Sequence, residues 1–410
     1  MTRLKIAHVS TVSQGLKILL LNQMRSFQDQ GFEVVGISAP GPEVAAIESA
    51  GVRYVPVPMT RRITPLADLI SLWRLYRVMR RERFALVHTH TPKAALLGQY
   101  AAALAGVPIR VHTIHGLYFP GNMKPRRRWL YTLMERLTML PSHLNLSQNP
   151  EDIPVAIQER ICRADRIQLL GNGIDLEAFD PARQPPEKRL ATRARLGLTR
   201  EHKVVGMVAR FVAEKGWHEM LEAAQIIKQQ CPAARFLFIG PMEPFKKDAL
   251  QPALIEEMGL ADAAQLLGYR ADMPDLYAIM DVLALPSHRE GFPRAPMEAA
   301  ALGVPSVVTE IRGCRQAVTH NATGYLVPVR APKQLASALL DLLRDDCRRQ
   351  AFGRAARKTA LEEFDERAVF ARVHRAYQQL LAKGGKGEDG NGRCEPTTRH
   401  TLPNLENSTD

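Results

Sequence analysis

Short apolar runs alternate with helix-length amphipathic stretches along most of the chain, and this rhythm constrains the fold more than any other feature. In the first half, the runs LKIAHVS, FEVVGISA and FALVHTH are each followed by a stretch with helical periodicity. Apolar runs separated by helices are typical of a parallel sheet, because each crossover helix covers a face of the sheet and buries it. The first half therefore predicts a doubly wound α/β domain.

A second series of the same kind begins at KVVGMVAR and continues through ARFLFIG, AQLLGY, DVLALPS, PSVVTE and GYLVPV. The proline-rich polar stretch DPARQPPEKR separates the two series. Because 410 residues exceed one ordinary domain, we expect two Rossmann-like doubly wound domains that face each other across a cleft, over residues 1–178 and 190–360. Ligands of such sheets bind beyond the carboxyl ends of the strands, so the informative residues should follow strands.

The C-terminal part of the chain is expected to contain a helix and a tail. Residues 361–382 are predicted to form a helix that packs back on the first domain. Residues 383–410 are polar and glycine-rich with almost no apolar side chains, which predicts a disordered tail.

The charge balance favours anionic partners. Lys and Arg number 55 and Asp and Glu 42, a formal charge of +13, which suits a nucleotide, a phospholipid surface or a nucleic acid. The alternative is that this charge only keeps the protein soluble. No aromatic-rich basic sheet or recognition-helix motif supports nucleic acid as a partner. The five cysteines have no metal-ligand spacing and no signal peptide begins the chain, so we expect reduced thiols in the cytoplasm.

Two carboxylates flank a proline-rich turn in HREGFPRAPMEAAALGVPSVV, which covers residues 288–308. Glu290 falls in a loop after the strand-like DVLALPS, and Glu298 falls in the first turns of the helix that follows. A helix N-terminus with free N–H groups binds phosphate, and carboxylates nearby accept hydrogen bonds from sugar hydroxyls. The alternative, equally supported by this spacing, is that Glu298 caps its own helix and Glu290 is an ordinary surface residue.

Two further strand ends carry residues suited to a nucleotide. Arg210 ends the run KVVGMVAR, and Lys215 opens the next helix, so two cations stand at a strand-to-helix turn that suits a diphosphate. In LLGYRADMPDLY, Tyr269 and Arg270 could flank a flat base after Gly268. Ordinary partial burial is the alternative for Tyr269.

Taken together, ARFVAEKG, LLGYR, E(GFPRAPM)E and EAAALGVPSVV resemble the motifs of retaining glycosyltransferase family 4, which has the GT-B fold. In the first half, VHTHTPKAALLG and VHTIHG resemble the subgroup that builds capsule, O-antigen and exopolysaccharide repeat units. The resemblance covers about residues 4–380. Three local departures are Gln316, where the family has Glu, His320-Asn321, where an acidic-Gly turn is usual, and a glycine loop reduced to Gln14-Gly15-Leu16.

This resemblance implies roles for the charged residues. Arg210 and Lys215 would bind the donor diphosphate and stabilise its charge as the glycosidic bond breaks, so no metal and no cofactor are expected. Glu298 would hold the ribose hydroxyls and Glu290 would contact the donor sugar. The remaining donor contacts implied by the family are Gly15, Tyr269, Arg270, Gly291, Phe292 and Arg294.

The resemblance also singles out one histidine. His115 follows IRVHTI and matches the family histidine that lies against the donor sugar at the reacting carbon. In the same-face displacement usually drawn for this family, the leaving phosphate takes the acceptor's proton, so His115 would orient and polarise. Without the family, a structural role would be favoured for it, and His88, His90 and His112 are interpreted as structural.

Basic stretches in the first half predict attachment to a membrane surface. Seven arginines lie between residues 61 and 83, and KPRRRWLY at residues 124–131 combines four cations with Trp and Tyr. Basic helices with interfacial aromatics adsorb to anionic lipid, each cation contributing about 1 kcal/mol. We expect peripheral binding to the inner face of the cytoplasmic membrane, where a polyprenyl-diphosphate-linked acceptor would lie. A merely solvated helix face is the alternative.

These features lead to one preferred function and two alternatives. The preferred function is transfer of a hexose or N-acetylhexosamine from a nucleotide sugar, with uridine diphosphate favoured, to a lipid-linked saccharide in surface polysaccharide synthesis. A nucleotide-sugar epimerase of the same two-domain fold is the second hypothesis. A nucleic-acid-binding protein is the third.

Overall fold

The computed structural model describes residues 3–62, 64–117, 124–242 and 248–384. By their internal contacts, the described residues form two compact units. The first lies within Met1–His112, Leu137–Leu144 and Val373–Asp410, and the second lies within Thr113–Arg136 and Asn145–Arg372. The predicted tail falls outside the described residues from residue 385 onward.

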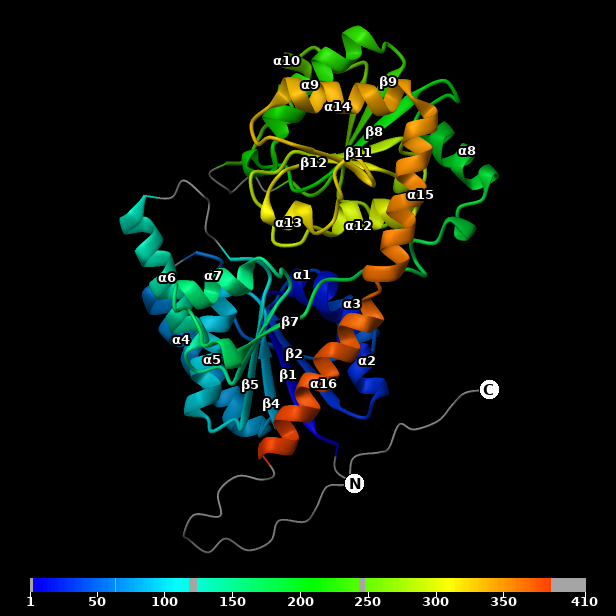
Figure 1. Ribbon diagram of the computed structural model, residues 1–410. Coiled ribbons are helices and arrows are strands. Elements are labelled where there is room, and N and C mark those ends of the chain that lie inside the picture. Colours follow the sequence, from blue (N-terminus) through cyan, green and yellow to red (C-terminus); the bar gives the residue numbers. More distant parts are fainter. Residues whose placement is uncertain (1–2, 63, 118–123, 243–247, 385–410) are drawn as a thin grey trace, which may run out of the picture. The chain divides into compact units, whose positions relative to one another are not determined.

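A seven-stranded sheet forms from the first half of the chain, in the order β3-β2-β1-β4-β5-β6-β7 (Figure 1). The neighbouring pairs β1–β2, β2–β3, β1–β4, β4–β5 and β6–β7 are parallel. The strands are β1 (Lys5–Val12), β2 (Glu33–Ala39), β3 (Arg53–Pro56), β4 (Leu86–Thr89), β5 (Ile109–Ile114), β6 (Leu144–Ser147) and β7 (Ile167–Leu169). A parallel sheet that grows outward on both sides of its first strand is the doubly wound order expected from the sequence.

Helices and a π-helical turn connect the strands of this sheet. They are α1 (Ser13–Gly15), a π-helical turn (Leu16–Leu20), α2 (Leu21–Asp29), α3 (Val44–Ser49), α4 (Pro65–Glu82), α5 (Pro92–Leu104), α6 (Pro125–Met139) and α7 (Asp152–Gln158). Alternate strand residues such as Ala7, Val9 and Val87 pack against α4 and α5 on one face. The intervening residues point to the other face, as the two-residue period of a strand requires.

A six-stranded parallel sheet follows, in the order β10-β9-β8-β11-β12-β13. Its strands are β8 (Lys203–Val208), β9 (Ala234–Ile239), β10 (Ala264–Gly268), β11 (Val282–Leu285), β12 (Ser306–Thr309) and β13 (Gly324–Val327). The helices are α8 (Pro186–Arg195), α9 (Trp217–Gln230), α10 (Leu254–Glu257), α11 (Met273–Tyr277), α12 (Arg294–Ala301), α13 (Arg312–Arg315), α14 (Pro332–Arg344) and α15 (Asp346–Glu363).

Two apolar cores cover the two faces of this second sheet. Phe236 and Phe238 of β9 belong to the core formed with α9 and α14, whereas Leu237 and Ile239 belong to the core formed with α12 and α15. Figure 1 shows α9 and α14 on one side of these strands and α12 on the other. Because both faces of these strands are buried, their sequences are continuous hydrophobic runs rather than alternating ones.

The C-terminal region contains two helices rather than one. The predicted helix at 361–382 overlaps the end of α15 and most of α16 (Glu366–Gly384). The break lies at Phe364, which is buried, and at Asp365, which forms an isolated bridge to Ile174. In the first unit, Tyr377 of α16 donates to or accepts from His88 Nδ1 at 2.6 Å. The sequence-based domain boundaries stay predictions.

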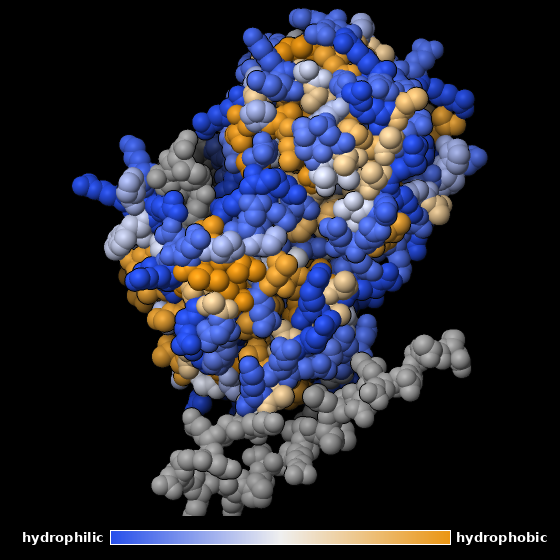
Figure 2. All heavy atoms as spheres, viewed as in Figure 1, coloured by the Kyte–Doolittle hydropathy of each residue, from blue (hydrophilic) through white to orange (hydrophobic). Residues whose placement is uncertain are grey.

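Among the described helices, none has the length and apolar character needed to cross a membrane. Figure 2 shows apolar side chains at the surface between stretches of hydrophilic ones.

Candidate functional site

The turn between β8 and α9 carries the two predicted cations. Arg210 follows β8, and Lys215 ends a short 3-10 turn at Ala213–Lys215. Gly216 comes next with φ 79°, and a Cβ there would lie 2.0 Å from the carbonyl oxygen of Pro286. The left-handed backbone and this close approach both require glycine. Gly216 therefore brings the Lys215 turn directly against the segment that follows β11.

A lysine–glutamate ion pair joins these two segments. Lys215 Nζ lies 2.7 Å from Glu290 Oε1, and each side chain is 13% exposed. Ser287 Oγ donates to the same carboxylate oxygen at 2.7 Å. The pair fixes Glu290 in its loop while leaving two of the three ammonium protons of Lys215 for other acceptors.

Glu298 is held from within its own domain. Tyr277 Oη donates to Glu298 Oε2 at 2.9 Å, and Arg294 Nε lies 3.6 Å from Glu298 Oε1. Tyr277 is fully buried, and burial raises the pKa of its hydroxyl well above the usual value, so the hydroxyl remains a donor. The carboxylate of Glu298 is thus oriented in α12. It does not cap this helix, because the N-cap position at Pro293 has no side-chain capping hydrogen bond.

Backbone donors gather between the two glutamates. Among the described residues, the N–H groups of Gly291 and Phe292 donate to no backbone carbonyl. The N-terminus of α12 follows them in the chain. Free N–H groups at a helix N-terminus attract anions, because the helix dipole adds partial positive charge there.

The end of β5 contacts this loop within the second unit. A Cβ on Gly291 would lie 1.8 Å from the carbonyl oxygen of His115, and one on Gly116 would lie 2.5 Å from the Cα of Gly291. Gly116 also has φ 121°, a conformation that side chains disfavour. The His115-Gly116 backbone therefore packs directly on the turn that holds Glu290.

His115 has a defined orientation. Its Nδ1 lies 3.1 Å from Gln148 Oε1, an oxygen that only accepts, so Nδ1 carries the proton and Nε2 is the acceptor nitrogen. Burial lowers the pKa of His115 to about 4, and the bond to Gln148 offsets only part of this effect. The imidazole is consequently neutral at physiological pH.

A chain of side-chain amides continues from this histidine to the glutamate loop. Gln148 Nε2 donates to Asn172 Oδ1 at 3.2 Å, and Asn172 Nδ2 donates to the carbonyl of Phe292 at 2.8 Å. Asn149 Nδ2 donates to the carbonyl of Gly291 at 2.9 Å. The side chains that orient His115 and those that hold the loop thus form one hydrogen-bonded network.

The two residues predicted to border a base differ in their surroundings. Tyr269 is 55% exposed and follows Gly268, which has φ 64°. Arg270 forms an ion pair with Asp272, whose oxygen lies 2.6 Å away, and the guanidinium lowers the pKa of that carboxyl. Tyr269 is therefore available for stacking, while Arg270 is already held by a carboxylate.

The second unit thus contains ten of the residues singled out from sequence: His115, Arg210, Lys215, Tyr269, Arg270, Glu290, Gly291, Phe292, Arg294 and Glu298. Direct contacts join Lys215 to Glu290, and join His115 to Gly291. Gly15 belongs to the first unit, where a Cβ on it would meet Ser10 Oγ at 2.4 Å.

Sequence reasoning missed the side chains that hold these groups. They are Gln148, Asn149, Asn172, Tyr277 and Ser287. A signal was present for the three amide side chains and for Ser287, because each follows a strand of a parallel sheet, where ligand-facing residues gather. Tyr277 ends a helix and gave no such signal.

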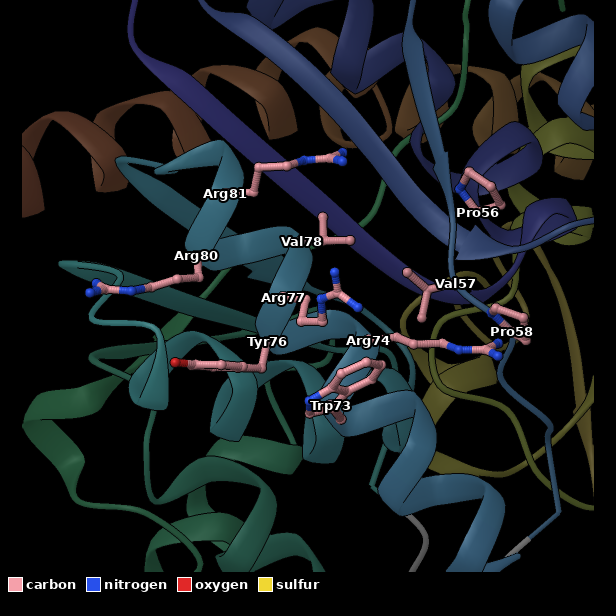
Figure 3. A pocket seen from close by; sticks show the side chains of 10 residues that line it. All are labelled: Pro56, Val57, Pro58, Trp73, Arg74, Tyr76, Arg77, Val78, Arg80 and Arg81. Atoms are coloured by element: carbon pink, nitrogen blue, oxygen red, sulfur yellow. The ribbon is translucent and has the colours of Figure 1, made fainter.

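A second feature lies in the first unit, on α4. A hollow of about 600 Å³ lies between this helix and the segment Pro56–Pro58, and it is lined by Trp73, Arg74 and Arg77 among others. In Figure 3, Trp73, Arg74 and Arg77 lie on the side of α4 toward Val57 and Pro58. Arg80 also lines the hollow, but its side chain is directed away from Val57 and Pro58. Arg77 stacks on the Trp73 ring at 4.7 Å.

The arginines of this hollow carry uncompensated charge. Within the part of the chain that the structure describes, Arg74, Arg77 and Arg80 form no ion pair. The preceding turns of α4 expose large apolar side chains, with Leu66 at 81% and Leu69 at 62%. The helix thus presents an apolar half followed by a cationic half.

Comparison with known proteins decides the family. Residues 188–359 match the family model described as glycosyl transferases group 1, and residues 14–141 match the glycosyl transferase 4-like domain. The Escherichia coli UDP-Gal:alpha-D-GlcNAc-diphosphoundecaprenol alpha-1,3-galactosyltransferase is 30% identical over 84% of this chain and 89% of its own length. The chain belongs to the group 1 glycosyltransferases. The capsular polysaccharide biosynthesis glycosyltransferase CapM of Staphylococcus aureus is a further relative of this glycosyltransferase, 27% identical over 92% and 97% of the two chains.

Solved structures share the fold of this glycosyltransferase. Anabaena Alr3699/HepE in complex with UDP-glucose superposes with a TM-score of 0.79 at 21% identity, covering 92% of this chain and all of that one. The predicted GT-B fold, built from two Rossmann-like sheets, is confirmed. A structure described as a UDP-N-acetylglucosamine 2-epimerase also shares the fold, with a TM-score of 0.67 at 15% identity. At this identity the likeness shows the fold alone. The enzyme is a glycosyltransferase, and the epimerase hypothesis has no support beyond the shared fold.

Proposed function

We propose that this glycosyltransferase moves a hexose or N-acetylhexosamine, with retention of configuration, from a nucleotide sugar to a lipid-linked saccharide in surface polysaccharide synthesis. The observation that carries the donor side is the Lys215–Glu290 pair beside the free N–H groups of Gly291 and Phe292. Uridine diphosphate is the carrier we favour, as in the names of the Escherichia coli relative and of the HepE complex.

The donor diphosphate would be bound by cations and backbone donors. Lys215 has two ammonium protons left for phosphate oxygens, and Arg210 follows the neighbouring strand end. The N-terminus of α12 adds partial positive charge. Such fixed donors stabilise the charge that develops on the diphosphate as the glycosidic bond breaks, and this chemistry needs no metal ion.

The two carboxylates would bind hydroxyls. Glu298 is fixed by the hydrogen bond from Tyr277, which suits its carboxyl group to accept hydrogen bonds from ribose. Glu290 is held by Lys215 and Ser287 in the loop that contacts the end of β5, which suits it to hydroxyls of the donor sugar. Tyr269 would stack on the base.

His115 would orient the sugar rather than transfer a proton. Its imidazole is neutral and its Nδ1–H is committed to Gln148, so Nε2 can accept a hydrogen bond from a sugar hydroxyl. A group with a pKa near 4 is a poor proton acceptor at neutral pH. This agrees with a same-face displacement in which the leaving phosphate takes the acceptor's proton.

The acceptor side is proposed on the surface of the first unit. The apolar half of α4 would insert at the boundary of an anionic membrane, and the arginines of the hollow would bind lipid phosphates. The names of the relatives from Escherichia coli and Campylobacter jejuni include diphosphoundecaprenol or diphospho-undecaprenol, a polyprenyl group that carries two phosphates. On these grounds we propose that the enzyme binds peripherally to the inner face of the cytoplasmic membrane.

Thermal shift against nucleoside diphosphates and nucleotide sugars, with chelator present, tests the donor site. We expect one nucleoside family to raise the melting temperature of the wild type, and Lys215→Ala to lose this response and most transfer activity. Lys228→Ala is the matched control, because Lys228 forms an ion pair with Asp262 on the surface of the same domain. Wild-type turnover in folded Lys215→Ala would refute the donor site.

Sedimentation with liposomes tests the membrane surface. Replacing Arg74, Arg77 and Arg80 by Gln should reduce binding to anionic vesicles at low salt by at least tenfold, since each lost cation removes about 1 kcal/mol. The control replaces three exposed arginines of the second unit, at positions 183, 189 and 200, and removes the same charge. Equal losses in both variants would show that net charge alone, and not the α4 hollow, drives binding.

A further inference from the structure

Three histidines meet in the core of the first unit. His8 lies in β1 and His88 in β4, and the two are register partners in the parallel pairing of these strands. His90 follows β4 by one residue, and its N–H still donates to the carbonyl of Val9 at 3.0 Å. Because strand side chains alternate between faces, all three imidazoles project from the same face of the sheet. Their residues are at most 2% exposed.

The distances between these rings are those of a ligand cluster. His8 Nδ1 lies 3.0 Å from His90 Nε2, and one nitrogen from each of the three residues lies within 4.8 Å of the others. Metal–nitrogen bonds of about 2.0–2.1 Å in a tetrahedral site set nitrogens roughly 3.3 Å apart. The first pair thus already has the separation of two ligands, and the third nitrogen needs to move by on the order of 1 Å.

An aromatic side chain packs on this cluster within the core. Phe27 stacks on the His8 ring, with the ring centroids 5.8 Å apart. Within the described residues, His8 Nε2 is buried without a hydrogen-bond partner. Because Nδ1 is the His8 nitrogen that faces His90, Nδ1 is the one placed to bind an ion, and Nε2 would then carry the proton.

Helix α16 supplies a second layer of contact. Tyr377 Oη lies 2.6 Å from His88 Nδ1, and the tyrosine is fully buried. A histidine that binds metal through one nitrogen donates its other N–H to such a partner, which fixes the tautomer and the ring orientation. With Nδ1–H donating to Tyr377, Nε2 is the nitrogen of His88 that can bind.

We propose that His8, His88 and His90 form a buried site for a divalent transition metal, with zinc as the ion, which joins β1 and β4 beneath α16. Three imidazoles without a carboxylate or thiolate suit zinc, cobalt, nickel and copper rather than magnesium or calcium. Among the described residues, no other group of three or more His, Cys, Asp or Glu side chains is close enough to hold an ion. The site is structural and independent of the proposed donor chemistry, whose residues apart from Gly15 lie in the second unit.

The test is metal loading of the purified, untagged full chain. The protein is first stripped of metal with a chelator. One sample is then dialysed against Co²⁺ or Zn²⁺ as folded protein, and a second sample is unfolded and refolded in the presence of the same ion. The metal bound per chain is measured in both samples. We expect one ion per chain, a visible Co²⁺ spectrum of four-coordinate type without thiolate bands, and a higher melting temperature with metal. X-ray absorption should report imidazole ligands.

Variants assign the ligands. His8→Gln and His90→Gln should each lose the ion, while the control His112→Gln should keep it. His112 is also a buried histidine, but it bonds to Thr89 on the opposite face of the sheet. Less than about a tenth of an ion per wild-type chain under both loading protocols would overturn the proposal. Sulfur ligands in the absorption spectrum would overturn it as well, even if the variants failed to fold.

Discussion

Gly291→Ala is the substitution that most directly tests the contact between the glutamate loop and the end of β5. The added Cβ would lie 1.8 Å from the carbonyl oxygen of His115. Non-bonded carbon and oxygen atoms approach to about 3.3 Å, so the two backbone segments must separate by roughly 1.5 Å. Neither atom belongs to a flexible side chain, so the separation has to come from the loop or the strand end.

The expected consequence is a displaced site in a folded protein. Overpacking of this kind costs about 1–3 kcal/mol, which a domain of this size tolerates. A displacement of about 1 Å at reacting groups can lower turnover by on the order of 100-fold. We therefore expect a fall of this size in kcat, with a modest loss in urea stability and unchanged far-ultraviolet circular dichroism.

Substitution of a second glycine is the control that distinguishes displacement of the site from loss of stability. Gly259 has φ 67° and no atom within 4 Å of an added Cβ, so Gly259→Ala introduces backbone strain without touching the loop. A left-handed alanine costs about 1–2 kcal/mol, which matches the expected loss in Gly291→Ala. Activity is measured as sugar transfer from the nucleotide sugar that stabilises the wild type. Wild-type kcat in Gly291→Ala, or an equal loss in both variants, would refute the argument.

Two further predictions concern hydrogen bonds and pH. Tyr277→Phe removes a buried hydrogen-bond donor from Glu298, so it should lower the free energy of urea unfolding by about 1.5–3 kcal/mol and weaken donor-nucleotide binding. The control Tyr325→Phe removes a similar bond to Asp341, so it should lower stability and leave donor affinity unchanged. A reversed pattern would contradict the role given to Glu298. His115 has a folded pKa of about 4, below its unfolded value near 6.5, so the unfolded chain binds more protons between these values and stability falls as pH drops through this window. The measurement is the free energy of urea unfolding at pH 6.5 and at pH 4. His115→Gln should reduce the difference between these two values by on the order of 2 kcal/mol. A difference equal to that of the wild type would mean that this imidazole is not desolvated.

Much of the fold could be read from local pattern. The alternation of apolar runs with helical stretches predicted two parallel sheets, and both formed, because strand and helix periods are properties of a few consecutive residues. The turn that separates Glu290 from Glu298 was predicted for the same reason, since α12 begins directly after Pro293. The break between α15 and α16 was not predicted, because it depends on Phe364 entering a core made by distant segments.

The sequence by itself determined which residues stand at strand ends, namely Arg210, Lys215, His115 and the glutamate loop, since these positions follow from element order. Only the tertiary structure decided which of them touch. The Lys215–Glu290 pair, the amide chain from Gln148 to Phe292 and the glycine contact between β5 and the loop each join segments far apart in the chain. Local periodicity places side chains on a face or at an edge, but distances between edges depend on how the sheets and helices pack.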